Sequence, residues 1–405
     1  MNNLFIIFLI LTAFLNLGCD SNNNLQPKAM VVSAHPLASE IGINVLKKGG
    51  NAADASIAVQ FALSVVYPSA GNIGGGGFFV YRENNGKCSS LDFREKAPLK
   101  AYRNMFLDSN YNVIENASLY SSRAVGVPGT VDGMVQIHKK YGLLKWKELI
   151  QPAIDLAENG FTLTLKEASK LNSFNNLKEE GSYNPYFRNK LKKGDSIFLP
   201  DLANTLKAIR DYKRKGFYNG KVAVNFLKEI SRINGLIDQN DLDNYKSVWR
   251  QPITGKYKNY KIISMGPPSS GGVLLLQMLK MAEFSSLGKL KFHSKDAIHL
   301  MTEIEKRSFA DRAKYLGDPD FYSVPTDNLL DTNYLKKRVD NINLNYTIPS
   351  EKIYAGNWDL NESEETTHFS IIDQYGNASS VTTTLNASFG SRIIVEGSGF
   401  LLNNE

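Results

Sequence analysis

Cysteine is scarce in this chain of 405 residues, which has only Cys19 and Cys88. A protein stabilised by disulfides needs a larger and regularly spaced set, so we expect no disulfide framework. The sequence also lacks the Cys-x-x-Cys and His-Glu-x-x-His patterns of common metal sites, and its five histidines are scattered. We therefore expect no metal site.

A hydrophobic run long enough to span a membrane is not seen at the N-terminus, where the apolar run covers residues 4–17. A spanning helix needs about 20 apolar residues. The run ends at Leu17-Gly18-Cys19 and is followed by a polar segment, which is typical of a secretory signal whose cysteine becomes lipidated. We interpret residues 1–19 as a lipoprotein-type signal peptide and residues 20–27 as a short polar linker.

Two features of this signal leave a second interpretation open. Residues 1–3 contain no Lys or Arg, and Asn16 occupies a position where a small or aliphatic residue is usual. Simple cleavage and secretion is the alternative to lipidation at Cys19. In both cases we expect an exported protein, in the periplasm or cell envelope, with a membrane contact through the lipid if Cys19 is modified.

Lysine does not follow the glycine run at residues 74–77, so the phosphate-binding pattern that ends in Gly-Lys-Ser or Gly-Lys-Thr is absent. We instead expect tight backbone packing at this run. The net charge is +7, but the basic clusters at 190–193 and 213–215 are short and lack interleaved aromatic residues. We interpret them as solvated helix ends and expect no nucleic-acid partner.

The middle of the chain shows no repeat and no low-complexity linker. The run at 52–66 is apolar on all sides and predicts a buried helix after Asn51 as its N-cap. Strands are predicted at 78–81 and 89–93. Further helical patterns cover residues 37–48, 131–141, 146–159, 202–212, 222–234, 272–284 and 297–315. The length allows one large domain.

Thr366 stands at the head of a predicted strand, directly after an acid-rich loop that ends in Glu365. If the Glu365–Thr366 bond breaks, Thr366 becomes a new N-terminus that carries a hydroxyl nucleophile and an α-amine base on one residue. An α-amine has a pKa of about 7.7–8.0, so much of it is neutral near physiological pH. The alternative is an ordinary strand that begins with a good β-former.

A β-hairpin is predicted after Thr366, with strands at 366–373 and 378–385 around a Gln-Tyr-Gly-Asn turn. The residue opposite Thr366 is Thr384 or Leu385, depending on the loop length. If it is Thr384, a second hydroxyl lies beside the nucleophile. Asn386 follows Thr384 by two residues and shares its face.

Several segments in order resemble the gamma-glutamyltransferases (glutathione hydrolases), a family of N-terminal-nucleophile enzymes. They are the glycine loop at 71–78, Leu-Asp-Phe-Arg-Glu at 91–95, Pro-Pro-Ser-Ser-Gly-Gly at 267–272, the segment 311–320, Thr-Thr-His at 366–368, Thr-Thr-Thr-Leu-Asn at 382–386, and Gly-Phe-Leu-Leu-Asn-Asn-Glu at 399–405. The resemblance covers the chain from about residue 28 to its last residue.

The resemblance implies an α+β fold, a four-layer αββα sandwich, here incomplete at the C-terminus. Residues 28–365 correspond to the large-subunit part and residues 366–405 to the start of the small subunit, produced by self-cleavage at Glu365–Thr366. The family continues beyond Glu405 with an aspartate, a serine pair and a glycine pair. The chain is therefore expected to be a fragment or a non-catalytic lipoprotein remnant, and inactive alone.

The resemblance also implies roles for individual residues of the site. Thr366 is the implied nucleophile with Thr384 beside it, Arg94 binds the substrate carboxylate, and Asn386 and Glu405 complete the substrate site. From the residues alone, Arg94 could equally form an ion pair with a neighbouring Asp92 or Glu95. His368 shares a face with Thr366, but we favour a structural role for it because the α-amine already supplies the base.

The implied substrates are glutathione and other gamma-glutamyl amides, whose glutamyl group passes to water or to an amino acid or peptide acceptor. No metal or organic cofactor is implied. The alternative on the same fold is a glutaryl- or cephalosporin-type acylase, whose substrate lacks or alters the α-amine.

Overall fold

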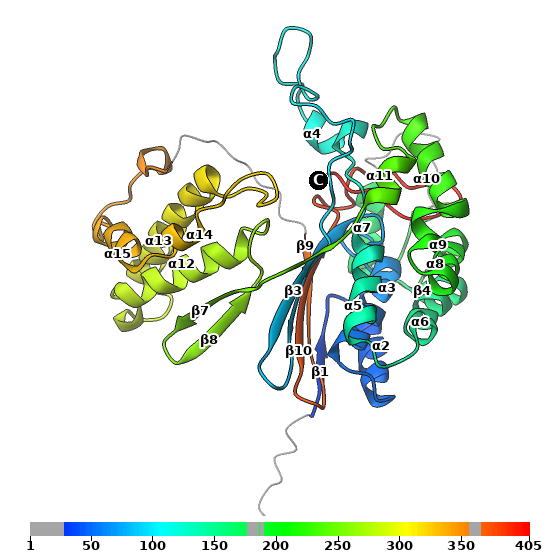
Figure 1. The fold of residues 1–405 in the computed structure, drawn as a ribbon, viewed down its shortest axis with the longest axis horizontal. Coiled ribbons are helices and arrows are strands. Elements are labelled where there is room, and N and C mark those ends of the chain that lie inside the picture. Colours follow the sequence, from blue (N-terminus) through cyan, green and yellow to red (C-terminus); the bar gives the residue numbers. More distant parts are fainter. Residues whose placement is uncertain (1–27, 176–185, 187–189, 356–365) are drawn as a thin grey trace, which may run out of the picture.

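The computed structural model describes residues 28–175, 186, 190–355 and 366–405. Its centre is a six-stranded antiparallel sheet in the order β1-β9-β10-β2-β3-β6 (Figure 1). The strands are β1 (Met30–Val32), β2 (Gly76–Arg82), β3 (Cys88–Asp92), β6 (Val248–Arg250), β9 (Thr366–Ile372) and β10 (Ala378–Thr384). Segments from both ends of the chain therefore build one sheet.

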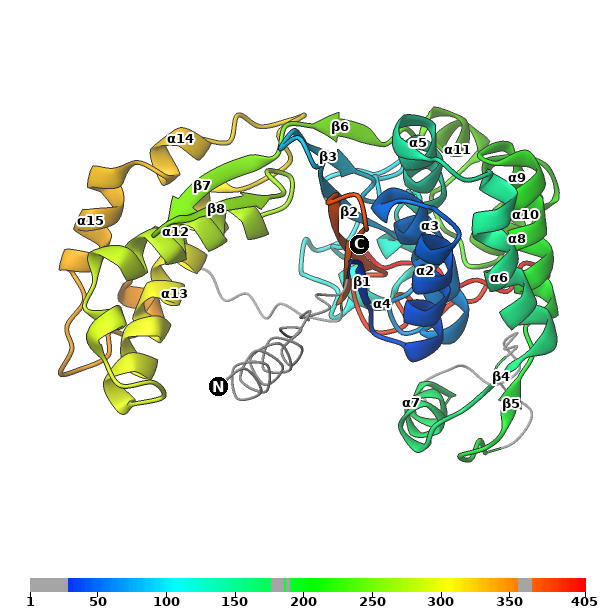
Figure 2. The same ribbon diagram turned by 90° about the horizontal axis from the view of Figure 1, so that it is seen from below.

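A layer of helices covers one side of this sheet (Figures 1 and 2). It contains α2 (Pro36–Lys47), α3 (Ala52–Val66) and α5 (Thr130–Tyr141), and α6 (Trp146–Asn159) and α8 (Pro200–Tyr212) pack behind α3. The same half holds α4 (Ala117–Tyr120), α7 (Leu165–Asn175), α9 (Lys215–Tyr218), α10 (Gly220–Arg232) and α11 (Gln239–Asn244), with a small sheet of β4 (Phe161–Thr162) and β5 (Ser196–Ile197).

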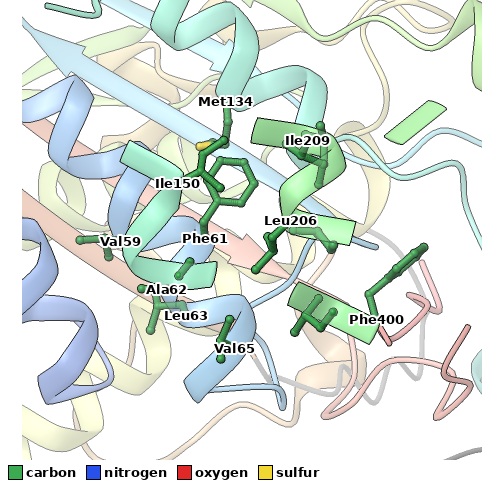
Figure 3. Packing of buried hydrophobic residues seen from close by; sticks show 14 of the residues in the cluster. Val59, Phe61, Ala62, Leu63, Val65, Met134, Ile150, Leu206, Ile209 and Phe400 are labelled. Carbon is green, nitrogen blue, oxygen red and sulfur yellow. The ribbon is translucent and has the colours of Figure 1, made fainter. Parts of the chain in front are cut away.

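Helix α3 is the centre of the core, and every one of its residues is buried. Its first turn is closed by a capping box, in which Asn51 accepts from the Asp54 N–H and Asp54 accepts from the Asn51 N–H. Figure 3 shows Phe61 of α3 among Met134 of α5 and Ile150 of α6. The predictions of a buried helix and of its Asn51 cap are confirmed.

A second cluster of helices lies on the other side of the six-stranded sheet (Figure 1). It contains the two-stranded sheet β7 (Ile253–Tyr257) and β8 (Tyr260–Ser264), with α12 (Gly271–Phe284), α13 (Lys295–Tyr315), α14 (Thr326–Leu329) and α15 (Thr332–Asp340). Its own core forms around Met281, Leu300, Ile304 and Leu335. Helices, two sheets and further helices together confirm the α+β prediction.

Buried charges fix the packing of this second cluster. Arg307 pairs with Glu303 at 2.8 Å within α13, and both side chains are almost fully buried. Arg338 of α15 pairs with Asp311 of α13 at 2.8 Å, and the Tyr334 hydroxyl donates to the same carboxylate at 2.7 Å. Because buried charges are costly unless paired and hydrogen-bonded, these contacts specify how α15 lies on α13.

Within the part of the chain that is described, no helix is long and apolar enough to cross a membrane.

His35 links the start of α2 to α7 and is only 6% exposed. Its Nδ1 accepts from the Leu37 N–H at 3.2 Å, and its Nε2 lies 2.8 Å from Glu167 Oε1. An Nδ1 that accepts a hydrogen bond carries no proton, so the ring is neutral and donates from Nε2 to the carboxylate. Burial lowers the pKa of His35, and the Glu167 carboxylate offsets only part of that effect.

We expect the stability to depend on His35 between about pH 5 and pH 7. A folded-state pKa below the unfolded value of about 6.5 stabilises the protein above that pH, and the contribution is lost as the pH falls through the folded pKa. Substituting Asn, which also caps helices but does not titrate, should remove this pH dependence.

Urea unfolding followed by circular dichroism at three pH values in this range measures the effect. The wild-type free energy of unfolding should rise more steeply with pH than that of His35→Asn. Parallel curves for the two proteins would contradict the assignment.

Candidate active site

The hairpin of β9 and β10 sets the register of the site. Thr366 lies opposite Thr384 in the ladder, and Thr382 lies opposite His368. Of the two registers that the sequence allows, the one that places Thr384 rather than Leu385 opposite Thr366 is therefore confirmed. The side chain of Thr366, like Glu365 and Cys19, lies outside the described part of the structure, so its backbone position alone enters the geometry.

Strand β2 pairs with the other edge of β10 and places Gly76 opposite Thr384. A Cβ atom at Gly75 would lie 2.2 Å from the Thr384 carbonyl oxygen, and one at Gly77 would lie 2.2 Å from the Thr382 carbonyl oxygen. Real side chains do not fit at such distances. The glycine run is thus needed for close backbone approach to the strand that carries Thr384, as expected.

Asn72 is a site residue that was not predicted from the sequence. Its Nδ2 donates to the Thr383 hydroxyl at 3.0 Å and to the Thr384 carbonyl oxygen at 2.8 Å. Its Oδ1 accepts from the Gly75 N–H at 3.0 Å and from the Thr130 hydroxyl at 2.7 Å. One buried amide therefore joins the glycine run, the end of β10 and the start of α5. Its position before a glycine run was the available signal.

Asn386 adopts a left-handed backbone with φ of 73° directly beyond β10. Its N–H donates to the Thr384 hydroxyl oxygen at 2.8 Å, so the two residues that were predicted to share a face are in contact. The Asn386 side-chain amide donates to the Asn404 carbonyl oxygen at 2.8 Å. This bond joins the end of β10 to the segment 399–405.

Two buried asparagines fix the segment that ends in Glu405. Asn403 Nδ2 donates to the carbonyl oxygens of Gly74 at 2.9 Å and Gly126 at 2.8 Å, and its Oδ1 accepts from the Gly126 N–H at 2.8 Å. Asn404 donates to the Leu119 carbonyl oxygen at 2.7 Å. The backbone before Glu405 is therefore held between the glycine loop and the loop before α5.

Arg94 and Glu405 form an ion pair. The Arg94 side chain is 42% exposed and that of Glu405 is 14% exposed, so the pair lies at the protein surface with the carboxylate more enclosed. Arg94 is held through its backbone, whose carbonyl oxygen accepts from the Tyr245 hydroxyl at 2.7 Å. A guanidinium next to a carboxylate is the complement of a ligand that carries both an anionic and a cationic group.

The alternative partners proposed for Arg94 are not the ones observed. Asp92 accepts from Arg250 Nε at 2.9 Å, and it contacts Arg94 only through the Arg94 backbone N–H at 3.0 Å. The Glu95 carboxyl group accepts no side-chain hydrogen bond among the described residues. The Arg94 guanidinium pairs with Glu405, which lies more than three hundred residues away in sequence.

His368 is bonded to hydroxyl groups. Its Nδ1 lies 2.9 Å from the Thr382 hydroxyl, and its Nε2 lies 3.1 Å from Ser380 and 3.2 Å from Ser370. These contacts lie along the sheet and lead away from Thr384, which agrees with a structural role. Among the described residues there is no group of three or more His, Cys, Asp or Glu side chains that could hold a metal ion.

Known proteins match this chain over the segment that contains these residues. The family model described as "Gamma-glutamyltranspeptidase" matches residues 38–405. A glutathione hydrolase proenzyme of Escherichia coli K12 is 42% identical over 383 residues, which is 93% of this chain and 66% of that protein. The chain thus spans slightly less than two thirds of that relative. An acylase proenzyme of a Pseudomonas strain (SE83) is 35% identical over 396 residues, 95% of this chain and 70% of the acylase.

Solved structures give the same grouping. The gamma-glutamyltranspeptidase of Helicobacter pylori matches with a TM-score of 0.78 and 46% identity, covering 82% of this chain and 97% of that one. A cephalosporin acylase of Bacillus halodurans matches with a TM-score of 0.76 and 25% identity, covering 93% of this chain and 69% of that one. The matched segment includes the glycine run, Arg94, the β9–β10 hairpin and Glu405, and the chain belongs to the gamma-glutamyltranspeptidase family.

Proposed function

We propose that this chain is part of a gamma-glutamyltransferase, or glutathione hydrolase, that processes itself at Glu365–Thr366 and then uses Thr366 as its nucleophile. The observation that carries the proposal is the arrangement across one end of the sheet. Thr366 lies opposite Thr384, and Thr384 lies opposite Gly76. The backbone of Phe93 and Glu95 packs against Gly76, and Arg94 between them pairs with Glu405. The position of the proposed nucleophile Thr366 and the Arg94–Glu405 ion pair thus lie at the same end of the sheet.

The processing step is an acyl shift. The Thr366 hydroxyl attacks the carbonyl carbon of Glu365, and the peptide nitrogen of Thr366 leaves as the free α-amine. Water then hydrolyses the resulting ester, which releases the Glu365 carboxylate and regenerates the hydroxyl. The register supports a role for the Thr384 hydroxyl in this step, because opposite residues in an antiparallel ladder have Cβ atoms about 4.5–5.5 Å apart.

The transfer reaction repeats this chemistry on the substrate. The Thr366 hydroxyl attacks the gamma-carbonyl carbon of glutathione or a related amide, and the Thr366 α-amine takes the hydroxyl proton. That proton passes to the departing amine. Water or the amine of an amino acid or peptide then attacks the glutamyl ester and restores the enzyme.

Arg94 and Glu405 select the glutamyl head. The guanidinium binds the substrate α-carboxylate and Glu405 accepts from the α-ammonium, so the substrate replaces an internal ion pair with two external ones. A glutaryl substrate of the acylase type lacks the ammonium and would leave Glu405 without a partner. This favours the gamma-glutamyl reaction over the acylase alternative.

Export is the second part of the proposal. The apolar run at 4–17, followed by Cys19, supports a protein of the cell envelope that is lipid-anchored at this cysteine. Such an anchor would place the site outside the cytoplasm. Labelling with a radioactive fatty acid, in the wild type and in Cys19→Ala, tests the anchor, because only the wild type should carry label.

Processing is tested in the full-length gene product by Thr366→Ala, which removes the attacking hydroxyl. We expect one unprocessed band on a denaturing gel, where the wild type shows two. Thr367→Ala is the matched control, because it removes the neighbouring hydroxyl on the other face of β9 and should still give two bands. Two bands from Thr366→Ala would end the hypothesis.

Substrate selection is tested by comparing the hydrolysis of gamma-glutamyl and glutaryl anilides. The wild type should prefer the gamma-glutamyl anilide. Glu405→Ala should raise KM for it by about 10- to 100-fold, since a hydrogen bond to a charged group contributes about 1.5–3 kcal/mol. Glutaryl hydrolysis should change much less. Equal wild-type rates on the two anilides would refute the role of the ion pair in reading a zwitterion.

A further inference from the structure

One end of the six-stranded sheet carries an excess of positive charge. Five segments meet there, at residues 28–32, 45–50, 82–88, 138–143 and 373–377. They contain seven Lys or Arg residues against two acidic residues, Glu83 and Asp373, whereas the whole chain has 47 basic and 40 acidic residues. All seven are exposed, and we call them the basic end: Lys28, Lys47, Lys48, Arg82, Lys87, Lys139 and Lys140.

The loop between β9 and β10 brings the first two of these segments together. Met30 of β1 lies opposite Ile372, so residue 28 lies beside this loop. The Tyr375 hydroxyl donates to the Gly49 carbonyl oxygen at 3.1 Å, directly after the last turn of α2, which carries Lys47. The N-terminal end of β1 and the C-terminal end of α2 therefore share this end of the molecule.

Two further contacts add the other segments. The Asn84 N–H donates to Asn377 Oδ1 at 2.9 Å, so the turn between β2 and β3 lies beside the β9–β10 loop. The Asn51 side chain donates to the Tyr141 carbonyl oxygen at 2.7 Å, which holds the C-terminal end of α5 beside the start of α3. Figure 1 shows β1 and the turns of the two hairpins at the lower end of the sheet. The seven cations thus gather at one end of the molecule.

The protein does not neutralise the cations of the basic end. Among the described residues, none of them forms an ion pair, whereas Lys100, Lys147 and Lys207 of the same half each pair with an acid. Asp373 is only 1% exposed, and its carboxylate is occupied by hydrogen bonds inside the protein. An anionic partner would relieve the mutual repulsion of these cations.

Lys140 shows how closely the cations approach one another. Its ammonium lies 3.7 Å from the centre of the Trp249 ring. Partial burial lowers the pKa of Lys140, and the neighbouring Lys87 ammonium lowers it further, while Glu83 offsets part of the effect. Cations from α5 and from the β2–β3 turn therefore repel each other across the surface, and a bound anion would stabilise both.

Exposed apolar side chains lie among these cations. Tyr375, in the β9–β10 loop, is 47% exposed, and Leu143, just beyond α5, is 63% exposed. Tyrosine combines an apolar ring with a polar hydroxyl and is enriched at the headgroup level of bilayers. Clustered Lys and Arg residues are attracted to anionic lipids. This combination fits the surface of an anionic membrane.

The chain also leads from this end to a candidate anchor. Lys28 is the first described residue, and residues 20–27 separate it from Cys19. A fully extended chain spans at most about 3.3–3.6 Å per residue, so a lipid on Cys19 would hold Lys28 within about 30 Å of the bilayer. Thr366 lies at the other end of β9, about 20 Å from Ile372.

We propose that the basic end docks on the phospholipid headgroups of an anionic bilayer and holds the candidate active site on the side that faces away from the bilayer. The inference rests on the proposed function only for the tether at Cys19, because the charge of this end is independent of the tether. Each Lys or Arg near an anionic surface contributes roughly a fivefold increase in binding. A lipid chain and a polybasic surface together give a stable attachment that a single chain does not.

Vesicle sedimentation tests the docking with the mature gene product, expressed from residue 20 so that no lipid is attached. We expect binding to vesicles of equal parts phosphatidylglycerol and phosphatidylcholine, and no binding to phosphatidylcholine alone. Binding should weaken about tenfold between about 50 and about 200 mM NaCl, because salt screens exposed charges. The joint substitutions Lys47→Gln, Lys48→Gln, Lys87→Gln and Lys139→Gln should weaken it on the order of 100-fold.

A variant with the same change in net charge is the matched control. Lys213→Gln, Lys215→Gln, Lys221→Gln and Lys228→Gln remove four exposed cations on and next to α9 and α10, which lie away from β1 in Figures 1 and 2. This control should retain nearly wild-type binding. Circular dichroism shows whether both variants are folded.

Hydrogen exchange of the vesicle-bound wild type reports the orientation. Exchange should slow at residues 83–87 and 374–377, in the two turns of the basic end. It should stay unchanged at residues 392–397, just before the segment that ends in Glu405.

The outcomes separate the docking surface from the proposed function. If vesicle binding shows the expected losses but Cys19 carries no fatty acid, or gamma-glutamyl anilide is not hydrolysed, that part of the proposed function fails and the docking surface stands. The docking surface is overturned if the wild type does not bind anionic vesicles at about 50 mM NaCl. It is also overturned if the two variants bind equally well, or if exchange slows at 392–397 instead of the two turns.

Discussion

The arrangement of the site depends on the hydrogen bonds that the Asp373 carboxylate accepts. It closes the loop between β9 and β10 by accepting from the N–H groups of Tyr375 and Asn377, each at 2.9 Å, and from the Asn377 side chain at 2.8 Å. It also accepts from the Ala52 N–H at 2.8 Å. A buried carboxylate with four donors is well satisfied.

This one group couples the hairpin register to the core. Because side chains alternate along a strand, a slip of one residue in the hairpin would place Leu385 opposite Thr366 and turn the other residues of β10 to the opposite face. Asp373 prevents the slip through the loop, and its bond to Ala52 ties the loop to the start of α3, the most buried helix described. The turn therefore determines which residues lie opposite each other at the site, at the far end of the hairpin.

Much of the fold could be predicted from the sequence where local patterns dominate. The apolar run at 52–66 and the capping residue Asn51 correctly indicated α3, and the helix predicted at 297–315 is observed as Lys295–Tyr315. Strand β1 and the pair β7–β8 were missed. Strand β1 is only three residues long and joins the sheet through β9, which follows it by more than three hundred residues, so no local pattern specifies it.

The site was predictable to the extent that its residues lie on regular elements. The hairpin gave Thr384 as one of two candidates for the position opposite Thr366. In contrast, Asn72, Asn403 and Asn404 act through side-chain amides that bond to backbone groups of distant segments. Apart from the glycine run that follows Asn72, the sequence carries no signal that distinguishes these asparagines from those of a surface turn. Only the assembled backbone shows which amides are enclosed.

The ion pair of Arg94 and Glu405 illustrates why such clamps matter for recognition. Arg94 is 42% exposed, and ion pairs that reach the solvent contribute little to stability. The selectivity of the proposed site depends instead on the positions of the Arg94 guanidinium and the Glu405 carboxylate. Arg94 is fixed by the Tyr245 hydroxyl through its carbonyl oxygen, and Glu405 by the buried amides of Asn403 and Asn404. The hydrogen-bonded backbone thus sets where the two charged groups lie relative to each other.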